Sequence, residues 1–207
     1  MGRDTKAKCR QCRREGEKLF LKGERCYTKS CAITRHNAPP GEQPKRRRPR
    51  RSHYLRHLRE KQKARRIYGV REAQFRNYVA QAKRRKGVTG QALLILLERR
   101  FDNTLYRVGF ASSRAQARQL ITHGHFQIGN QGTNVPSVLL REGDVVAVKE
   151  NRRERIKRIL ESNQDRETPS WLEKNLETMQ FQVVAPPNLE ETVQTIDTNL
   201  IVEFYSR

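Results

Sequence analysis

Apolar residues recur at helical spacing through much of the first half of the chain. Between residues 71 and 86 an apolar stripe repeats at i, i+3, i+4 and i+7: Phe75, Tyr78, Val79 and Ala82. This stripe predicts a helix, and the basic residues that end it suit the partial negative charge of a helix carboxyl terminus. An earlier helix is expected to begin at the N-cap Ser52 and to stop at Gly69. A third helix, over about 91–100, is apolar on most sides and is expected in the core.

Two shorter helices are expected next. Residues 103–108 form a short helical turn that Gly109 closes. A helix capped by Ser112 or Ser113 follows and ends near residue 123.

After these helices the pattern becomes typical of strands. Residues 126–128 alternate, 129–132 form a turn, and 145–148 are expected to be a buried strand. Three later elements complete the pattern: a helix over 152–162 and strands over 179–184 and 200–205. The fold class is therefore α+β, in which residues 91–149 place helices against a small, curled antiparallel sheet.

The chain is strongly basic, and its charge is concentrated toward the amino terminus. Lysine and arginine number 44 against 22 aspartate and glutamate, a formal net charge of +22. Residues 1–66 carry +17, residues 67–150 carry +7, and residues 151–207 carry −2. Self-repulsion at such a charge opposes compaction, so a polyanion is the natural partner. We expect the amino-terminal half to meet that polyanion and the acidic carboxyl-terminal quarter to meet protein.

Several classes of protein are disfavoured by what the sequence lacks. The first thirty residues hold no apolar stretch typical of a signal peptide, and the longest apolar run, 92–97, is too short for a membrane helix. The G-x-x-x-x-G-K-[ST], H-E-x-x-H and G-x-S-x-G patterns are also absent. An enzyme, a membrane partner and a small-molecule substrate are therefore not expected. We interpret Asp102, an acidic residue near the basic candidates, as a helix cap.

All four cysteines of the chain fall in two close pairs within residues 1–40. Cys9 and Cys12 are separated by two residues, and Cys26 and Cys31 by four, with thirteen residues between the pairs. In a reducing compartment such pairs suit one structural zinc ion, and a [4Fe–4S] cluster fits the same four thiolates. The other interpretation is four free thiols. Residues 1–40 hold few large apolar side chains, however, and would not support a core without a metal.

The largest cluster of positive charge lies in residues 41–51 and in the helix after them. The prolines of this stretch exclude a helix, so we interpret it as an extended basic linker. Charge runs are often solvated tails, but this one continues onto an amphipathic helix, which favours contact with RNA phosphates and stacking on tyrosine. The residues expected to contact RNA here are Arg46, Arg47, Arg48, Arg50, Arg51, Tyr54, Arg56, Arg59, Lys61, Lys63, Arg65 and Arg66, with Arg76, Lys83 and Arg84 on the next helix.

A second set of RNA-binding candidates lies on and just after the helix over 113–123. Arg114 and Arg118 are four residues apart, so we expect them to project together as a phosphate clamp, away from the apolar side. The alternative is an ordinary pair of solvent-facing arginines. His123 and His125 are interpreted as a pair that faces phosphate or solvent, because a metal site there lacks a further ligand nearby in the sequence.

Several blocks of sequence carry a family resemblance. The stretch ERRFDNTLYRVGFA from residue 98 and the pattern SR-x-x-ARQL-x-x-HGH from residue 113 closely resemble the bacterial small-subunit ribosomal protein S-four family. Further blocks keep the family's order along the chain: REKQK from 59, YG from 68, QFRN from 74 and EFYSR at the end. The four cysteines resemble those of the metal-binding variant of this family.

The resemblance implies an architecture and a set of partners. The architecture is a cysteine metal-binding module over 1–40, the linker over 41–51, a mainly helical domain over 52–97 and 150–207, and an inserted α/β RNA-binding domain over 98–149. The partners are small-subunit rRNA, bound early in assembly, ribosomal protein S-five and other small-subunit proteins, and mRNA near its entry channel. The chain would be a cytoplasmic, structural constituent of the ribosome that influences translational accuracy.

In this family the acidic carboxyl-terminal region would face ribosomal protein S-five. Candidate contact residues are Glu190, Glu191 and Glu203. Two stretches depart from the family pattern: residues 129–132, where V-N-G is common, and the residues after Gly41, where Q-H-G is common. Two other classes compete: an RNA-modifying enzyme, which would need a further catalytic domain, and a zinc-containing nucleic-acid-binding regulator outside the ribosome.

Overall fold

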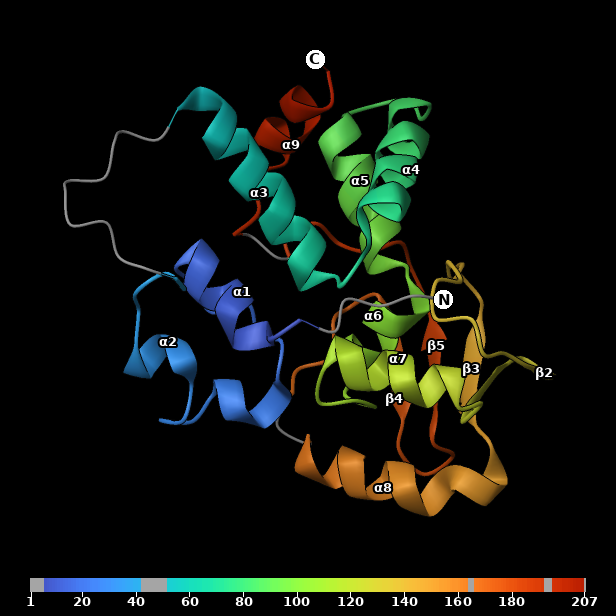
Figure 1. Cartoon of the computed structure of the whole chain (residues 1–207). Helices are drawn as coiled ribbons and strands as arrows, with labels where there is room; N and C mark the ends of the chain where they lie inside the picture. Colours follow the sequence, from blue (N-terminus) through green and yellow to red (C-terminus); the bar gives the residue numbers. More distant parts are fainter. Residues whose placement is uncertain (1–5, 42–51, 164–165, 192–194, 207) are drawn as a thin grey trace. The chain divides into compact units, whose positions relative to one another are not determined.

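The computed structural model describes residues 6–41, 52–163, 166–191 and 195–206, and Figure 1 labels its helices and strands. The chain divides into two compact units. Unit 1 comprises Met1–Leu93 with Gln194–Arg207, and unit 2 comprises Leu94–Val193. No helix in the described ranges is long and apolar enough to cross a membrane.

The elements of unit 1 in the described residues are all helices. They are α1 (Lys8–Glu15), the 3-10 turn η1 (Gly23–Cys26), α2 (Ala32–Arg35), α3 (His53–Ile67), α4 (Glu72–Lys83), the start of α5 (Thr89–Glu98) and α9 (Thr198–Phe204). Ser52 caps α3 as expected, since its hydroxyl accepts a hydrogen bond from the Leu55 amide at 3.2 Å. The apolar stripe of α4 is buried, which confirms the helix that its spacing predicted.

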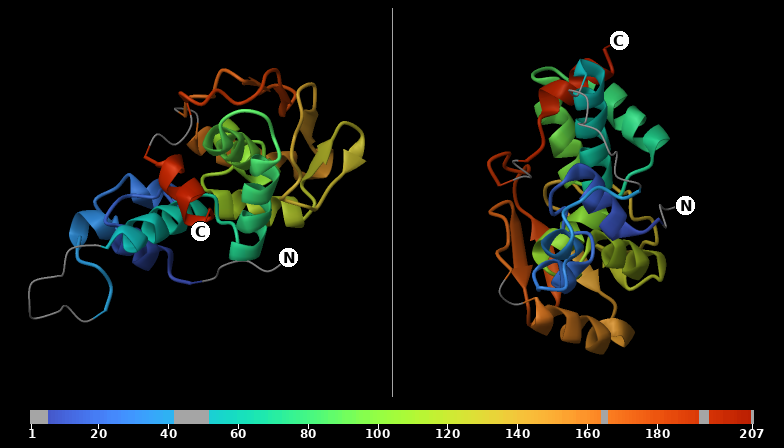
Figure 2. Two further views of the ribbon diagram at one scale, coloured as in Figure 1. Left: turned by 90° about the horizontal axis from the view of Figure 1, so that it is seen from above. Right: turned by 60° about the vertical axis from the view of Figure 1, so that its left-hand side comes forward.

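The last element of the chain is a helix, so the prediction of a strand over 200–205 was wrong. Asp197 caps α9: its carboxylate accepts hydrogen bonds from the amides of Asn199 and Leu200 at 3.0 and 3.4 Å. This cap satisfies amides that would otherwise lack a partner at the start of the helix. Ile201 is fully buried, and α9 lies beside α3 (Figure 2). The segment that forms α9 is too short to show a clear hydrophobic period in the sequence, so its packing against α3 determines its conformation.

Unit 2 places helices against a five-stranded antiparallel sheet, which confirms the α+β class (Figure 1). Its helices are the rest of α5, α6 (Phe101–Val108), α7 (Arg114–Thr122) and α8 (Arg153–Ser162), with the 3-10 turn η2 (Glu150–Arg152). Its strands are β1 (Phe126–Ile128), β2 (Gln131–Gly132), β3 (Val145–Val148), β4 (Leu172–Asn175) and β5 (Gln180–Val183), in the order β2-β1-β3-β5-β4.

One hydrophobic core extends across the expected domain boundary at residue 150. Phe101 and Phe126 from the expected RNA-binding domain share this core with Ile156, Trp171 and Phe181. The sheet also crosses the boundary, since β5 pairs with β3 in antiparallel register. Residues 150–193 therefore belong with 98–149 in unit 2, contrary to the expectation that they join the helical domain. Strand pairing over this distance leaves no mark in the local pattern.

Candidate RNA-binding surfaces and cysteine site

Several basic residues of α3 are held by carboxylates of unit 1. The Lys61 side chain is only 6% exposed and donates to both carboxylate oxygens of Glu72 at 3.0 Å. Its ammonium group also lies 4.6 Å from the centroid of the Phe204 ring. Arg65 donates to the same carboxylate at 2.9 Å. Lys61 is buried and its charge is neutralised by Glu72, so the prediction that Lys61 contacts RNA is corrected.

A second group of cations on α3 pairs with carboxylates in α1, just after α1 and on α3 itself. Glu15, with a side chain only 3% exposed, forms ion pairs with Arg66 and with Arg59, the latter at 3.8 Å. Burial raises the pKa of Glu15, and the two arginines oppose that rise. Lys63 lies 3.0 Å from two further carboxylates. These cations are partly exposed, but much of their charge is neutralised within unit 1.

A smaller set of predicted RNA contacts in unit 1 is exposed to solvent. Tyr54 is 53% exposed. The exposed basic residues are Arg56, Arg76, Lys83 and Arg84. We call these five residues the exposed basic set. The predicted contacts Arg46, Arg47, Arg48, Arg50 and Arg51 lie outside the described residues.

In unit 2, Asp102 is a buried carboxylate, so its interpretation as a helix cap was wrong. Its side chain is 1% exposed, and the N-cap position of α6 is occupied by Arg100. Arg100 donates to Asp102 through Nε at 3.0 Å and Nη2 at 2.8 Å. Arg118 of α7 donates to the same carboxylate through Nε at 3.0 Å. Two guanidinium groups thus compensate a charge that would be costly to bury alone.

Arg114 is also held against α6. Its Nε donates to the Asn103 side-chain oxygen at 2.8 Å, and its guanidinium lies 4.4 Å from the centroid of the Tyr106 ring. Asn103 in turn donates to the buried Glu98 carboxylate at 2.8 Å. Arg114 and Arg118 therefore join α7 to α6, contrary to the prediction that they project away from the packed side. The i, i+4 spacing correctly placed them together but did not reveal their partners.

The two histidines after α7 differ in environment. His123 is exposed, whereas His125 is 2% exposed and neither of its ring nitrogens has a hydrogen-bond partner among the described residues. Burial lowers the pKa of His125, and the nearby charges of Arg152 and Arg155 lower it further. The prediction that this imidazole faces phosphate or solvent is corrected by its burial.

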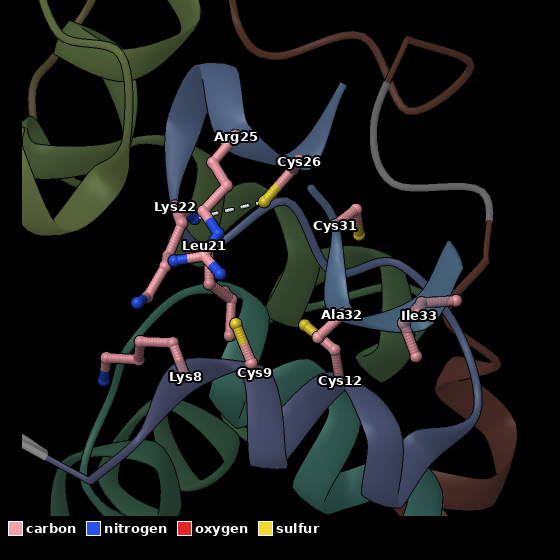
Figure 3. A pocket seen from close by; sticks show the side chains of 10 residues that line it. All are labelled: Lys8, Cys9, Cys12, Leu21, Lys22, Arg25, Cys26, Cys31, Ala32 and Ile33. Carbon is pink, nitrogen blue, oxygen red and sulfur yellow. Dashed lines mark hydrogen bonds between the residues drawn. The ribbon is translucent and has the colours of Figure 1, made fainter. Parts of the chain in front are cut away.

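All four cysteines line one pocket formed by α1, η1 and the start of α2 (Figure 3). Cys9 is partly buried and the other three are buried. The Lys22 amide donates to the Cys26 sulfur at 3.4 Å. Zinc–sulfur bonds of about 2.3 Å in a tetrahedron place the sulfurs about 3.8 Å apart. In the described part of the chain no three of these sulfurs lie within 4.8 Å of one another, so they share a pocket without closing a tetrahedron.

Two of the thiols have shifted pKa values. Burial raises the pKa of Cys12, partly opposed by a hydrogen bond from the Leu19 backbone. Burial acts in the same direction on Cys31, but hydrogen bonds from the backbone of Ile33 and Thr34, the Lys18 charge and the Thr34 hydroxyl together lower the pKa of Cys31 overall. Backbone donors therefore already point at sulfur in this pocket, as they do around thiolate ligands.

The three carboxylates expected to meet protein are not neighbours. Glu190 and Glu191 belong to unit 2, and Glu203 belongs to α9 in unit 1. Glu191 accepts hydrogen bonds from the Ser170 hydroxyl and amide at 2.6 and 2.9 Å, and these bonds lower its pKa. Glu203 lies 2.6 Å from the His57 ring.

Two family models match consecutive parts of the chain. The ribosomal protein S4/S9 N-terminal domain matches residues 3–98, and the S4 domain matches residues 99–146. The small ribosomal subunit proteins uS4 of Syntrophomonas wolfei and of Clostridioides difficile are 51% and 50% identical to the chain. Both alignments cover 100% of each protein. This chain belongs to the ribosomal protein S4 family. The uS4 protein of Geobacter metallireducens, at 52% identity over the full length of both chains, agrees.

Membership of the S4 family bears on two earlier expectations. The resemblance stated from the sequence blocks is confirmed, and so is the expectation that the chain is not an enzyme, since the family is one of structural ribosomal proteins. The boundary between the two family models, at residues 98 and 99, falls at the carboxyl end of α5. The S4-domain match ends at residue 146, whereas the compact unit continues to Val193.

Proposed function

We propose that this chain is a structural protein of the small ribosomal subunit, works in the cytoplasm and binds rRNA. Its full-length similarity, at 51% identity, to a protein named for that subunit carries the proposal. The distribution of charge supports it. Unit 2 holds 14 lysines and arginines against 13 aspartates and glutamates, so nearly all of the net +22 belongs to unit 1. Phosphate neutralisation by such an excess is the main source of affinity for RNA.

Within unit 1 we assign the RNA contact to the exposed basic set. Its cations are open to solvent, whereas the Lys61 side chain is only 6% exposed and is paired with Glu72. Tyr54 adds an aromatic face for a base, as is common in RNA recognition. Arg114 and Arg118 serve packing first, since each already binds a side chain of α6.

The experiment compares two triple variants that remove the same charge. Arg56→Ala, Arg76→Ala and Arg84→Ala together should weaken small-subunit rRNA binding by tens of fold or more, because each charge-assisted contact contributes roughly 1.5–3 kcal/mol. The control is Arg141→Ala, Lys157→Ala and Arg158→Ala, three exposed cations of unit 2. Equal losses in both variants would show that total charge, and not the exposed basic set, determines binding.

A second measurement tests the ribosomal role itself. Wild-type protein should co-sediment with small ribosomal subunits through a high-salt wash. A chain that is washed off, and that prefers DNA to RNA, would instead support the alternative of a zinc-containing nucleic-acid-binding regulator outside the ribosome.

We propose further that the four cysteines bind one structural zinc ion. Three observations support this: the four cysteines share a pocket, three of them are buried, and the Lys22 amide donates a hydrogen bond to the Cys26 sulfur. Binding would draw the sulfurs together and stabilise residues 1–40, whose apolar content is low. Cys12→Ser should then release an amino-terminal fragment on proteolysis. Elemental analysis that finds iron with sulfide would assign a [4Fe–4S] cluster instead.

For protein partners we propose that the acidic carboxyl-terminal region meets ribosomal protein S-five, near the mRNA entry channel. Glu190 is exposed and is the contact we favour, whereas Glu203, although its side chain is 57% exposed, already contacts His57 at 2.6 Å. Glu191 is less available because Ser170 holds it. Charge reversal at Glu190 should raise misreading while leaving isolated rRNA binding nearly unchanged. Crosslinks from this region mainly to rRNA would contradict the assignment.

A further inference from the structure

Three side chains at the contact between α3 and α9 bring metal-ligating atoms together. His53 and His57 lie one helical turn apart on α3, and Glu203 lies on α9. One ligand atom from each of the three lies within 4.8 Å of the other two. Both helices belong to unit 1, where they lie side by side. In the part of the chain that the structure describes, no other set of three histidine, cysteine or carboxylate side chains comes as close.

The orientation of the His57 ring is fixed by its own helix. Its Nδ1 lies 2.7 Å from the His53 carbonyl oxygen, and a carbonyl only accepts, so Nδ1 carries a hydrogen. The other nitrogen, Nε2, therefore faces the Glu203 carboxylate at 2.6 Å. The residue is 2% exposed, so packing holds this orientation. A hydrogen bond from one ring nitrogen to a carbonyl is the arrangement that orients histidines toward metal ions.

With the hydrogen on Nδ1, the lone pair of Nε2 faces a Glu203 carboxylate oxygen, so a proton or a metal cation must lie between them. A single proton would satisfy those two groups alone. A proton would not explain why a second imidazole lies beside this pair. The ring centroids of His53 and His57 are 4.2 Å apart. Two histidines at i and i+4 on one helix face, with a carboxylate from another helix, form the donor set of zinc sites.

We propose that His53, His57 and Glu203 bind one divalent transition-metal ion of the Zn²⁺ class, which clips α9 onto α3. Ligand bonds of about 2.0–2.2 Å to nitrogen and oxygen require the 2.6 Å contact to widen by several tenths of an ångström. Glu203 can provide that movement because its side chain is 57% exposed. His53 is also exposed, so water completes the coordination. This proposal does not depend on the ribosomal role.

Two charged neighbours of the site, Lys61 and Glu60, are engaged elsewhere. Lys61, whose ammonium lies near the adjacent Phe204 ring, is held by Glu72. Glu60, one turn after His57, accepts from the Asp197 amide at 2.9 Å and pairs with a lysine. The three ligands are therefore the groups that an incoming cation meets.

The test measures zinc bound per full-length chain under reducing conditions, by equilibrium dialysis and elemental analysis. Wild-type protein should bind one more zinc ion than His53→Ala or His57→Gln. Each substitution should weaken that ion's binding by more than about tenfold, since even changes outside the ligand shell cost about 10–100-fold. His36→Ala, which removes an exposed histidine elsewhere in unit 1, is the matched control and should bind as wild type does.

The cysteine pocket is followed separately with Co²⁺, because thiolate ligation gives an intense charge-transfer band that nitrogen and oxygen ligands do not. That band should be the same in wild type and in the histidine variants. His53→Ala keeps the contact between His57 and Glu203, so it separates metal binding from folding, and thermal unfolding with a chelator checks that. Equal zinc binding by wild type, His53→Ala and His57→Gln would overturn the proposal and leave the contact as a hydrogen bond.

Discussion

Arg118 of unit 2 pairs with a buried carboxylate, so we expect it to contribute to the stability of the fold. We predict that Arg118→Ala lowers the free energy of unfolding by about 1.5–3 kcal/mol, because it removes a charged hydrogen-bond donor from the buried Asp102. Urea unfolding measures the change. Gln119→Ala, on the exposed side of the same helix, should stay within about 0.5 kcal/mol of wild type. If Arg118→Ala instead weakened rRNA binding without changing stability, the earlier prediction that Arg118 binds phosphate would be supported.

His125 makes the stability of unit 2 depend on pH. Burial holds its pKa below the ordinary value of 6.5. The unfolded chain therefore takes up a proton as the pH falls through 6.5, while the folded chain does not until a lower pH. We predict that the free energy of unfolding falls between pH 7.5 and pH 5.5, and that His125→Phe reduces this fall. His123→Ala, at an exposed histidine, should keep the wild-type dependence.

At this scale the sequence predicted local features well and partners poorly. The cap Ser52 was identified correctly, and Ser113 was one of the two caps named for the later helix, because a capping side chain bonds amides two or three residues away. Asp102 and Lys61 were misassigned because their partners include groups that lie 16 and 11 residues away. A charged residue looks solvent-exposed in a sequence until its counter-ion is known.

At the scale of elements, α5 and α9 approach closely at Gly90. A Cβ added there would lie 2.7 Å from the Cβ of Thr198, the first residue of α9. Alanine ordinarily favours a helix over glycine by about 1 kcal/mol, but here that preference meets a steric clash. We predict that Gly90→Ala lowers the free energy of unfolding by about 1–3 kcal/mol.

A second substitution tests the cause of that loss. Thr198→Gly removes the side chain that the new methyl group would meet. The loss of unfolding free energy in the double variant Gly90→Ala, Thr198→Gly should therefore be smaller than the sum of the losses in the two single variants. Strict additivity in the double-mutant cycle would show that the two helices do not conflict at this point.

The elements that the sequence misjudged were those decided by distant contacts. Helices α4 and α7 were found because each carries its own apolar side, and α3 was found from its cap Ser52 and its stop at Gly69. The conformation of α9 depends on α3, and the membership of β4 and β5 in unit 2 depends on pairing with β3. Neither dependence has a local signature, so both the strand over 200–205 and the boundary at 150 were predicted wrongly.

At the scale of the whole molecule, the uneven charge predicts a steep salt dependence. Each phosphate contact contributes about −0.9 to the slope of log affinity against log salt on duplex DNA, so six to ten contacts predict about −5 to −9. The Arg56, Arg76 and Arg84 variant should lose about one unit of slope for each contact removed. A wild-type slope shallower than about −2 would show that phosphate pairing is not the main attraction.

The composition of unit 1 from both ends of the chain also sets an order of events during synthesis. His57 and Glu203 are separated by 146 residues, so α3 leaves the translating ribosome long before its partner α9 exists. At about 5–20 residues per second the wait is roughly 7–30 s. Unit 2 is continuous in sequence and can complete its core in that interval. A nascent chain from which α9 has not yet emerged would therefore hold a finished sheet in unit 2 while its helical unit is still unfinished.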